Sequence, residues 1–137
     1  MKFVTPAQAP AAPAAPSYED WQAQGGTAVA LSNDFDVKAI APDLSKLELI
    51  TLDFPKWVDG RAYTQARLLR SRHRFTGEIR AVGEVLVDML PLLARTGFDA
   101  VQLRADQDEA AARRALGFFP IGHYQADVLE PRPEFAR

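Results

Sequence analysis

Residues 47–82 read LELITLDFPKWVDGRAYTQARLLRSRHRFTGEIRAV, and this stretch decides the fold. Its two apolar segments, Leu47–Phe54 and Glu78–Val82, are short and bounded by turn-forming residues, which is typical of strands covered on both faces. Between them, Arg61–His73 places alanine and leucine side chains on one stripe, which predicts an amphipathic helix. Because a helix joins the two strands, we expect parallel strands connected by a right-handed crossover.

The same alternation of strand and helix patterns extends in both directions from this stretch. Further strands are predicted at Thr27–Leu31 and Ala100–Leu103, and further helices in a short segment from Tyr18, at Glu84–Arg95 and at Gln107–Leu116. The sequence therefore predicts a small α/β fold, a βαβαβ unit with three to four parallel strands. Either a three-layer sheet or a half-barrel fits this pattern.

Several residues are expected to mark the helix ends. Asp59 and Asp106 are predicted N-caps, and Gly97 and Gly117 lie just past two helices. Pro91 falls inside the predicted third helix and should kink or restart it, since proline removes an internal hydrogen bond.

The chain divides into one predicted domain with two tails. Residues 1–16 alternate alanine and proline and have little to bury, so we expect a disordered tail there. Residues 17–130 form the single α/β domain, and 131–137 a C-terminal tail.

Composition excludes several classes of function. The 137 residues carry a net charge of -2 and no cysteine, which argues against a nucleic-acid binder and against disulfides, thiolate nucleophiles and cysteine-held metal clusters. No apolar stretch is long enough for a membrane span or a signal peptide, so we expect a cytoplasmic protein. No metal or cofactor motif is visible, and the two histidines lack a nucleophile–base arrangement.

The carboxyl ends of parallel strands gather at one edge, where such folds place their binding sites. At this edge the stretch from Asp53 to Tyr63 is densest in special residues. Lys56 and Arg61 beside a helix N-terminus, with Arg80 from the next strand, would bind an anion, and Asp53 is a candidate general acid or base. The alternative is structural: Asp59 makes a cap, while Phe54 and Trp57 close the core.

Positive charge is concentrated between Lys56 and Arg80, where seven basic residues face two acidic ones, a net charge of +5. Such a surface suits an acidic partner or an anionic ligand, because guanidinium groups pair with carboxylates and phosphates. A solvated helix face is the simpler explanation.

From Leu49 onward the chain resembles a bacterial family, the domain-of-unknown-function 934 proteins, which are typically encoded beside sulfite reductase. The resemblance rests on residues 49–90, on RTGFDAVQLRADQD at 95–108, and on Tyr124-Gln125. The family usually has phenylalanine in place of Trp57. The matching signature positions are Asp53, Pro55, Lys56, Asp59, Gly60, Arg61, Tyr63, Gln65, Arg67, Arg80 and Gly83.

This resemblance implies a role in assimilatory sulfite reduction, without supplying catalytic residues. The first hypothesis is a non-catalytic accessory protein that docks on the sulfite reductase haemoprotein or on its electron donor. The alternative is a small anion-binding enzyme or oxidoreductase acting on a sulfur-assimilation metabolite, with a homodimer as a third interpretation. The residues expected to bind the anion or the partner are Lys56, Asp59, Arg61, Tyr63, Gln65, Arg67 and Arg80.

Overall fold

The computed structural model describes residues 1–4, 15–119 and 127–132. Its centre is one parallel sheet in the order β1-β5-β4-β3-β2. The strands are β1 (Lys2–Phe3), β2 (Ala28–Leu31), β3 (Leu49–Phe54), β4 (Glu78–Gly83) and β5 (Ala100–Val101). With helices packed on this sheet, the predicted small α/β fold is confirmed.

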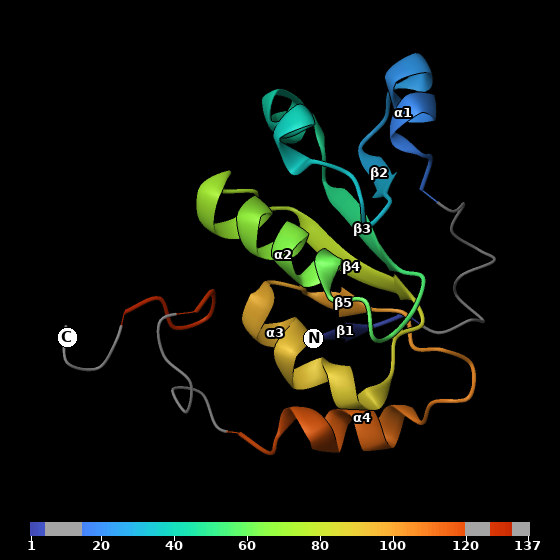
Figure 1. The fold of residues 1–137 in the computed structure, drawn as a ribbon, viewed down its shortest axis with the longest axis vertical. Coiled ribbons are helices and arrows are strands. Elements are labelled where there is room, and N and C mark those ends of the chain that lie inside the picture. Colours follow the sequence, from blue (N-terminus) through green and yellow to red (C-terminus); the bar gives the residue numbers. More distant parts are fainter. Residues whose placement is uncertain (5–14, 120–126, 133–137) are drawn as a thin grey trace.

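The helices pack mainly on one face of this sheet. Helices α2 and α3 lie side by side there, and α4 packs against α3 (Figure 1). No helix within the described ranges is long and apolar enough to cross a bilayer. The helices are α1 (Tyr18–Gln24), α2 (Arg61–Arg67), α3 (Leu90–Thr96) and α4 (Glu109–Leu116), the 3-10 helices η1 (Val37–Ala39), η2 (Ala41–Lys46) and η4 (Val87–Met89), and a π-helical turn η3 (Leu68–Arg72).

Of the two predicted arrangements, a three-layer sheet and a half-barrel, the strand order identifies the half-barrel. Strands β2, β3, β4 and β5 are neighbours in chain order, so each crossover advances in the same direction across the sheet. Right-handed crossovers that all advance one way put their helices on the same face, as in half of a (β/α)8 barrel. The sheet has one strand more than the predicted upper number, because β1 adds to the far edge beside β5.

Strand β1 contradicts part of the predicted tail at residues 1–16. Lys2 donates its N–H to Asp99 O at 2.7 Å and Val4 to Val101 O at 2.8 Å. The prediction was wrong here because a two-residue strand has no periodicity to detect, and backbone bonds hold it. Residues 5–14 lie outside the described residues, as do 133–137 of the predicted C-terminal tail.

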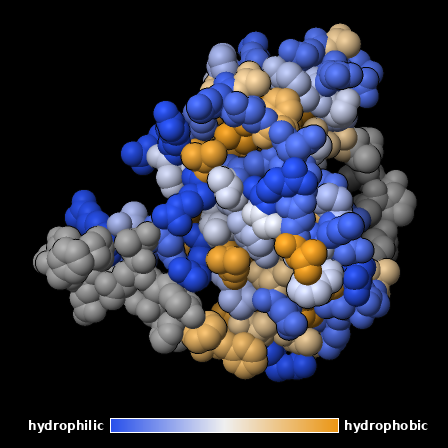
Figure 2. Space-filling model, in the orientation of Figure 1, coloured by the Kyte–Doolittle hydropathy of each residue, from blue (hydrophilic) through white to orange (hydrophobic). Residues whose placement is uncertain are grey.

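Strand alternation separates a core face from a second, more polar face. Ile50, Leu52 and Phe54 are fully buried among the helices. On the other face, Thr51 and Arg80 stand opposite each other in the register of β3 and β4. In Figure 2 the visible side of the molecule is mainly hydrophilic, with hydrophobic residues in several separate groups. Phe118 and Phe119, which follow α4, are among the exposed large hydrophobic residues.

The third helix and the N-caps differ in detail from the prediction. Pro91 sits in the first turn of α3, so the helix restarts at Leu90, and residues 84–86 are not helical. Gly60 rather than Asp59 is the N-cap of α2. Asp108 rather than Asp106 caps α4, by accepting from two backbone N–H groups of its first turn.

The guanidinium of Arg70 joins two connections, one before β4 and one before β5, at the amino ends of these strands. Its Nη1 donates to Phe75 O at 2.8 Å and to Gly77 O at 2.7 Å, its Nε donates to Gly97 O at 2.9 Å, and its Nη2 pairs with Asp99. Gly97 has a φ of +114°, and a Cβ there would lie 2.5 Å from Arg70 Cγ, so glycine allows this approach.

Arg70→Ala is expected to lower the free energy of unfolding by about 3 kcal/mol, because it leaves buried carbonyls without donors and Asp99 without its cation. The exposed neighbour Arg72 supplies the control, and Arg72→Ala should change stability by less than about 0.5 kcal/mol. Urea unfolding of both variants measures this difference. Equal effects would show that Arg70 is not the link between these connections.

Candidate functional site at the carboxyl edge of the sheet

The loops that follow β3, β4 and β5 are tied to one another at the carboxyl edge. Glu84 donates its N–H to Phe54 O at 2.7 Å, and Trp57 donates its N–H to Glu84 Oε2 at 3.2 Å. Arg104 in turn donates its N–H to Val85 O at 3.0 Å. These bonds connect all three loops, so the backbone that carries the side chains of the edge is held in place.

The most elaborate polar cluster at this edge is centred on Asp59. Its Oδ2 accepts from Arg61 Nη2 at 2.7 Å and from Asn33 Nδ2 at 2.8 Å, and its Oδ1 accepts from Arg61 Nε at 3.0 Å. The hydrogen bonds from Arg61 lower the pKa of Asp59 to about 2. The positive charge of Arg61 is therefore already matched within the chain.

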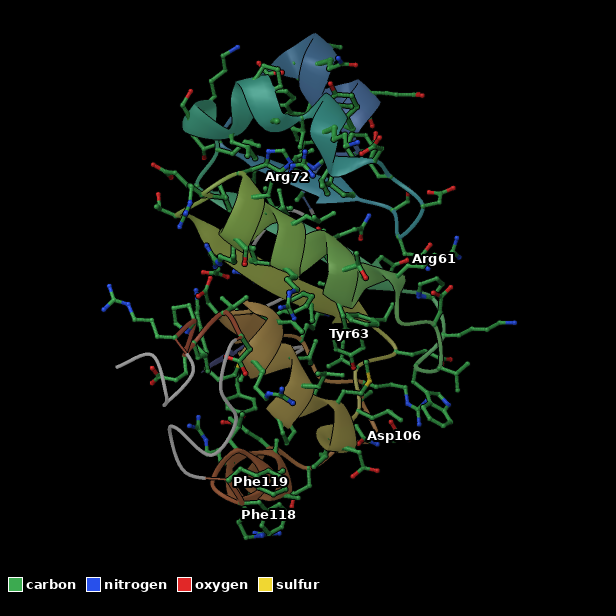
Figure 3. The ribbon with its side chains drawn as sticks, turned by 60° about the vertical axis from the view of Figure 1, so that its left-hand side comes forward. Arg61, Tyr63, Arg72, Asp106, Phe118 and Phe119 are labelled. Carbon is green, nitrogen blue, oxygen red and sulfur yellow. The ribbon has the colours of Figure 1, made fainter. Side chains whose placement is uncertain are left out.

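A second arginine at the edge is matched in the same way. Arg104 donates from Nε and Nη2 to the two carboxylate oxygens of Asp106 at 2.6 and 2.8 Å. This pairing lowers the pKa of Asp106 to about 2 and raises the pKa of Arg104. Figure 3 shows Arg61, Tyr63 and Asp106 along this one edge. Neither edge arginine offers an unmatched guanidinium to an anion.

Two of the predicted site residues on α2 point inward and hold the edge together. Gln65 donates from Nε2 to Ser32 O at 2.8 Å and to Phe35 O at 3.0 Å, which fixes the loop that carries Asn33. Tyr63 packs edge-on against Phe54, with ring centroids 5.1 Å apart, and burial raises the pKa of its hydroxyl. Gln65 therefore positions Asn33, which in turn binds Asp59.

Asp53 is the penultimate residue of β3, on the polar face and close to Gly83 at the end of β4. Gly83 has a φ of +93°, and a Cβ there would lie 2.5 Å from Asp53 Oδ1 and 2.5 Å from Phe54 O. Only glycine fits, because any side chain would strain the backbone and collide with the neighbouring strand. Burial raises the pKa of Asp53, the direction that keeps a proton available for transfer.

Arg80 does not lie with the other candidate residues. It is the third residue of β4, in register with Thr51 and Ala100, and therefore stands away from the carboxyl edge. Its Nη2 pairs with Glu78 Oε1 at 2.6 Å, and its side chain is largely buried. The expectation that Arg80 reaches the edge is wrong, because its place within the strand, rather than proximity in sequence, fixes its height in the sheet.

The basic segment between Lys56 and Arg80 is thus divided by the fold. Arg61, Arg70 and Arg80 are paired internally. Four exposed side chains form no ion pair among the described residues, namely those of Lys56, Arg67, Arg72 and Arg74. Only these four provide positive charge to a partner or ligand.

Trp57 lies at the surface of the edge rather than in the core. Its exposed fraction is 53%, and that of the adjacent Val58 is 66%. The alternative that Trp57 closes the core is therefore wrong, since Phe54 and Tyr63 close it. The sequence did contain a signal for this surface position: Trp57 lies in a stretch rich in turn-forming residues between the strand and the helix, and loops of this kind lie at the surface.

The family match agrees with this architecture. A sequence family described as "Bacterial protein of unknown function (DUF934)" matches residues 28–135. The chain belongs to this family. The DUF934 match begins at β2, so it includes every signature residue of the edge and leaves out β1 and α1. The comparison with curated proteins gives no match.

Metal binding by this DUF934 protein finds no support in the described ranges. No group of three His, Asp or Glu side chains in residues 1–4, 15–119 and 127–132 is placed to hold a metal ion. Carboxylates near the edge are used instead by Arg61 and Arg104.

The pairing of Asp59 predicts a specific acid dependence of stability. Its pKa is about 2 in the folded protein, against an ordinary value of 3.8, so the unfolded chain binds the proton first. The stabilisation is complete above about pH 4 and is lost as the pH falls through about 2. Asp59→Asn should flatten this part of the pH profile of urea unfolding. Arg61→Gln should flatten it too, and an unchanged profile in that variant would exclude the ion pair as its cause.

Proposed function

We propose that this DUF934 protein is a docking accessory of assimilatory sulfite reduction that binds a partner protein through the Trp57 loop, defined as residues 56–58. The observation that carries this proposal is the exposure of Trp57 and Val58 beside Lys56, which has no ion-pair partner among the described residues. Large apolar side chains exposed together at a surface are typical of interaction sites.

The Trp57 loop is held in place before any partner binds. Asp59 donates its N–H to Lys56 O at 3.0 Å, and Trp57 donates its own N–H to Glu84 at 3.2 Å. A loop fixed in this way loses little conformational freedom on binding, which favours affinity. Tryptophan is also among the residues that contribute most to binding energy at protein interfaces.

Charge supports an acidic partner surface. Lys56 lies within the loop and Arg67 on the exposed side of α2, and neither is engaged by a described carboxylate. Unmatched charges at the rim of an interface chiefly raise the association rate and orient the partner. The sulfite reductase haemoprotein and its electron donor are the proposed partners. The reason is that the Trp57 loop belongs to the signature by which the chain resembles proteins encoded beside sulfite reductase.

A pre-formed anion site at the carboxyl edge receives less support. The arginines that would recognise the anion, Arg61 and Arg104, each hold a carboxylate of their own chain in a forked arrangement. An incoming anion would have to displace Asp59 or Asp106. Docking needs no such displacement.

One observation favours a second candidate, a small-molecule enzyme that uses Asp53. Asp53 lies near the carboxyl end of a strand of the half-barrel, and its pKa is raised. Gly83 allows the next strand to lie close beside it. Barrel folds place catalytic residues at this position. Asp53 would then donate or accept a proton, while docking through the Trp57 loop would be secondary.

Growth of a deletion strain on sulfate, sulfite or sulfide as sole sulfur source separates these candidates. Docking predicts that the strain grows only on sulfide, that Trp57→Ala fails to restore growth on sulfite, and that Asp53→Asn restores it. Trp57→Phe should also restore growth, because phenylalanine keeps a large apolar side chain at the loop. Rescue by Trp57→Ala together with failure of Asp53→Asn would favour the enzyme.

Co-purification with the haemoprotein or its electron donor tests the partner directly. Trp57→Ala should reduce recovery of the partner at least about tenfold, the effect of removing an interface hot spot. Recovery by the wild type should fall as salt is raised, since Lys56 and Arg67 act through exposed charges. Equal recovery by Trp57→Ala, with an unchanged unfolding midpoint, would overturn docking through this loop.

A further inference from the structure

A cavity of about 300 Å3 lies at the amino ends of the strands, away from the carboxyl edge. The 3-10 helix η2 forms one wall, and the loop from His73 to Thr76, which follows α2 and η3, forms the other. Arg61 and Arg72 mark opposite ends of the α2 helix with its π-helical extension, and the cavity lies beyond the Arg72 end (Figure 3). We call it the amino-end cavity.

His73 brings a buried nitrogen without a partner to the amino-end cavity. Its imidazole lines the wall, and its Nε2 is inaccessible and forms no hydrogen bond within the described part of the chain. A buried polar atom left unsatisfied destabilises the folded state, so such atoms are uncommon in folded proteins. If the imidazole turned toward the cavity on binding, this nitrogen would hydrogen-bond the bound molecule and the destabilisation would be removed.

Arg74 lines the same cavity in a strained backbone conformation. Its φ is +58°, and among the described residues it is the one non-glycine residue with a positive φ. It follows the helix end at the position where glycine is usual, because glycine adopts this conformation without penalty. Arginine at this position therefore carries a backbone strain that glycine would not, and it is one of the residues that line the cavity.

The π-helical turn and the Arg70 guanidinium fix this loop. His73 donates its N–H to Leu68 O at 3.0 Å, and Phe75 donates its N–H to Leu69 O at 2.9 Å, so the turn holds one residue more than an α-helix would. Arg70 then holds Phe75 O at 2.8 Å. His73 and Arg74 are thereby set at the cavity by bonds that do not involve a ligand.

The groups at the cavity wall select for negative charge. Arg74, His73, Ser45 and Thr76 line the cavity and carry side chains that can donate hydrogen bonds, and none of the described lining residues carries a carboxylate. The nearby Asp43 is held by Lys46 at 2.8 Å. Alanine, proline and leucine side chains of η2, with Phe75, add an apolar surface.

We propose that the amino-end cavity binds a small organic anion, with its carboxylate, sulfate or phosphate group on Arg74 and His73 and its apolar body against η2 and Phe75. The volume is at the lower end of that of small-molecule sites and exceeds the space that a bare oxyanion needs. This site is separate from the Trp57 loop and from Asp53, so its test is independent of the proposed function.

Phenyl phosphate is a suitable probe, with phenol and inorganic phosphate as its two halves. In the full chain labelled with 15N at the imidazoles, phenyl phosphate should shift the Nε2 signal of His73, assigned with His73→Gln, more than that of His123. Phenol and inorganic phosphate should each bind at least about tenfold more weakly, because each lacks one of the two recognised features. Phenol binding as tightly as phenyl phosphate would overturn the assignment of an anion.

Arg74→Gly separates binding from folding. Glycine relieves the strained φ, so the unliganded variant should unfold at the same or a higher temperature than the wild type. Its affinity for phenyl phosphate, measured by calorimetry, should fall about tenfold or more, as expected from the loss of a charged hydrogen-bond donor.

Arg67→Ala removes the same charge from an exposed position on α2 and should bind phenyl phosphate as the wild type does. Equal losses in the two variants would indicate non-specific attraction to a basic surface and would overturn the site. An unmoved His73 signal at saturating phenyl phosphate would overturn it as well.

Discussion

The guanidinium of Arg70 is the interaction on which the amino end of this half-barrel depends. It lies between the connection before β4 and the connection before β5, and it donates hydrogen bonds to carbonyl groups of both. Asp99 forms an ion pair with it and also accepts a hydrogen bond from Ile79 N–H at 2.9 Å. A planar group with five donors can make these bonds at once, whereas lysine could not. The starts of β4 and β5 are therefore set by one side chain of the preceding helix.

The two ends of the α2 helix consequently have different chemistry. At its start, Asp59 neutralises Arg61, and Asn33 and Gln65 extend this polar network, although Gln65 Oε1 has no hydrogen-bond partner among the described residues. At its far end, beyond Arg70, the loop leaves Arg74 unpaired and His73 with an unsatisfied nitrogen among the described residues. The two ends thus differ in ion pairing, because Arg61 is paired with Asp59 whereas Arg74 has no ion-pair partner in the described part of the chain.

Sequence patterns predicted the elements whose periodicity is long enough to detect. Strands β3 and β4 and helix α2 were correct because their apolar spacing reflects burial against one core. Strand β1 was missed since its pairing uses backbone atoms beside an alanine- and proline-rich stretch.

The candidate site was less predictable, because partners of charged side chains depend on tertiary geometry. Proximity in sequence suggested that Arg80 joins Lys56 and Arg61, but its place within β4 puts it on the polar face with Glu78. The amino-end cavity left no trace in the pattern, since its walls come from segments about 30 residues apart whose contact only the fold creates.

The signature residues can now be divided according to the interactions that their side chains make within the chain. Gly83 is required by the close approach of β3, Tyr63 and Gln65 by packing and by the loop after β2, and Asp59 with Arg61 by their own ion pair. Maintaining the edge accounts for all of these. It does not account for Lys56 and Arg67, whose described side chains contact no opposite charge, nor for the exposed Trp57 between them. The proposed docking surface would use these residues together, because it acts outside the chain.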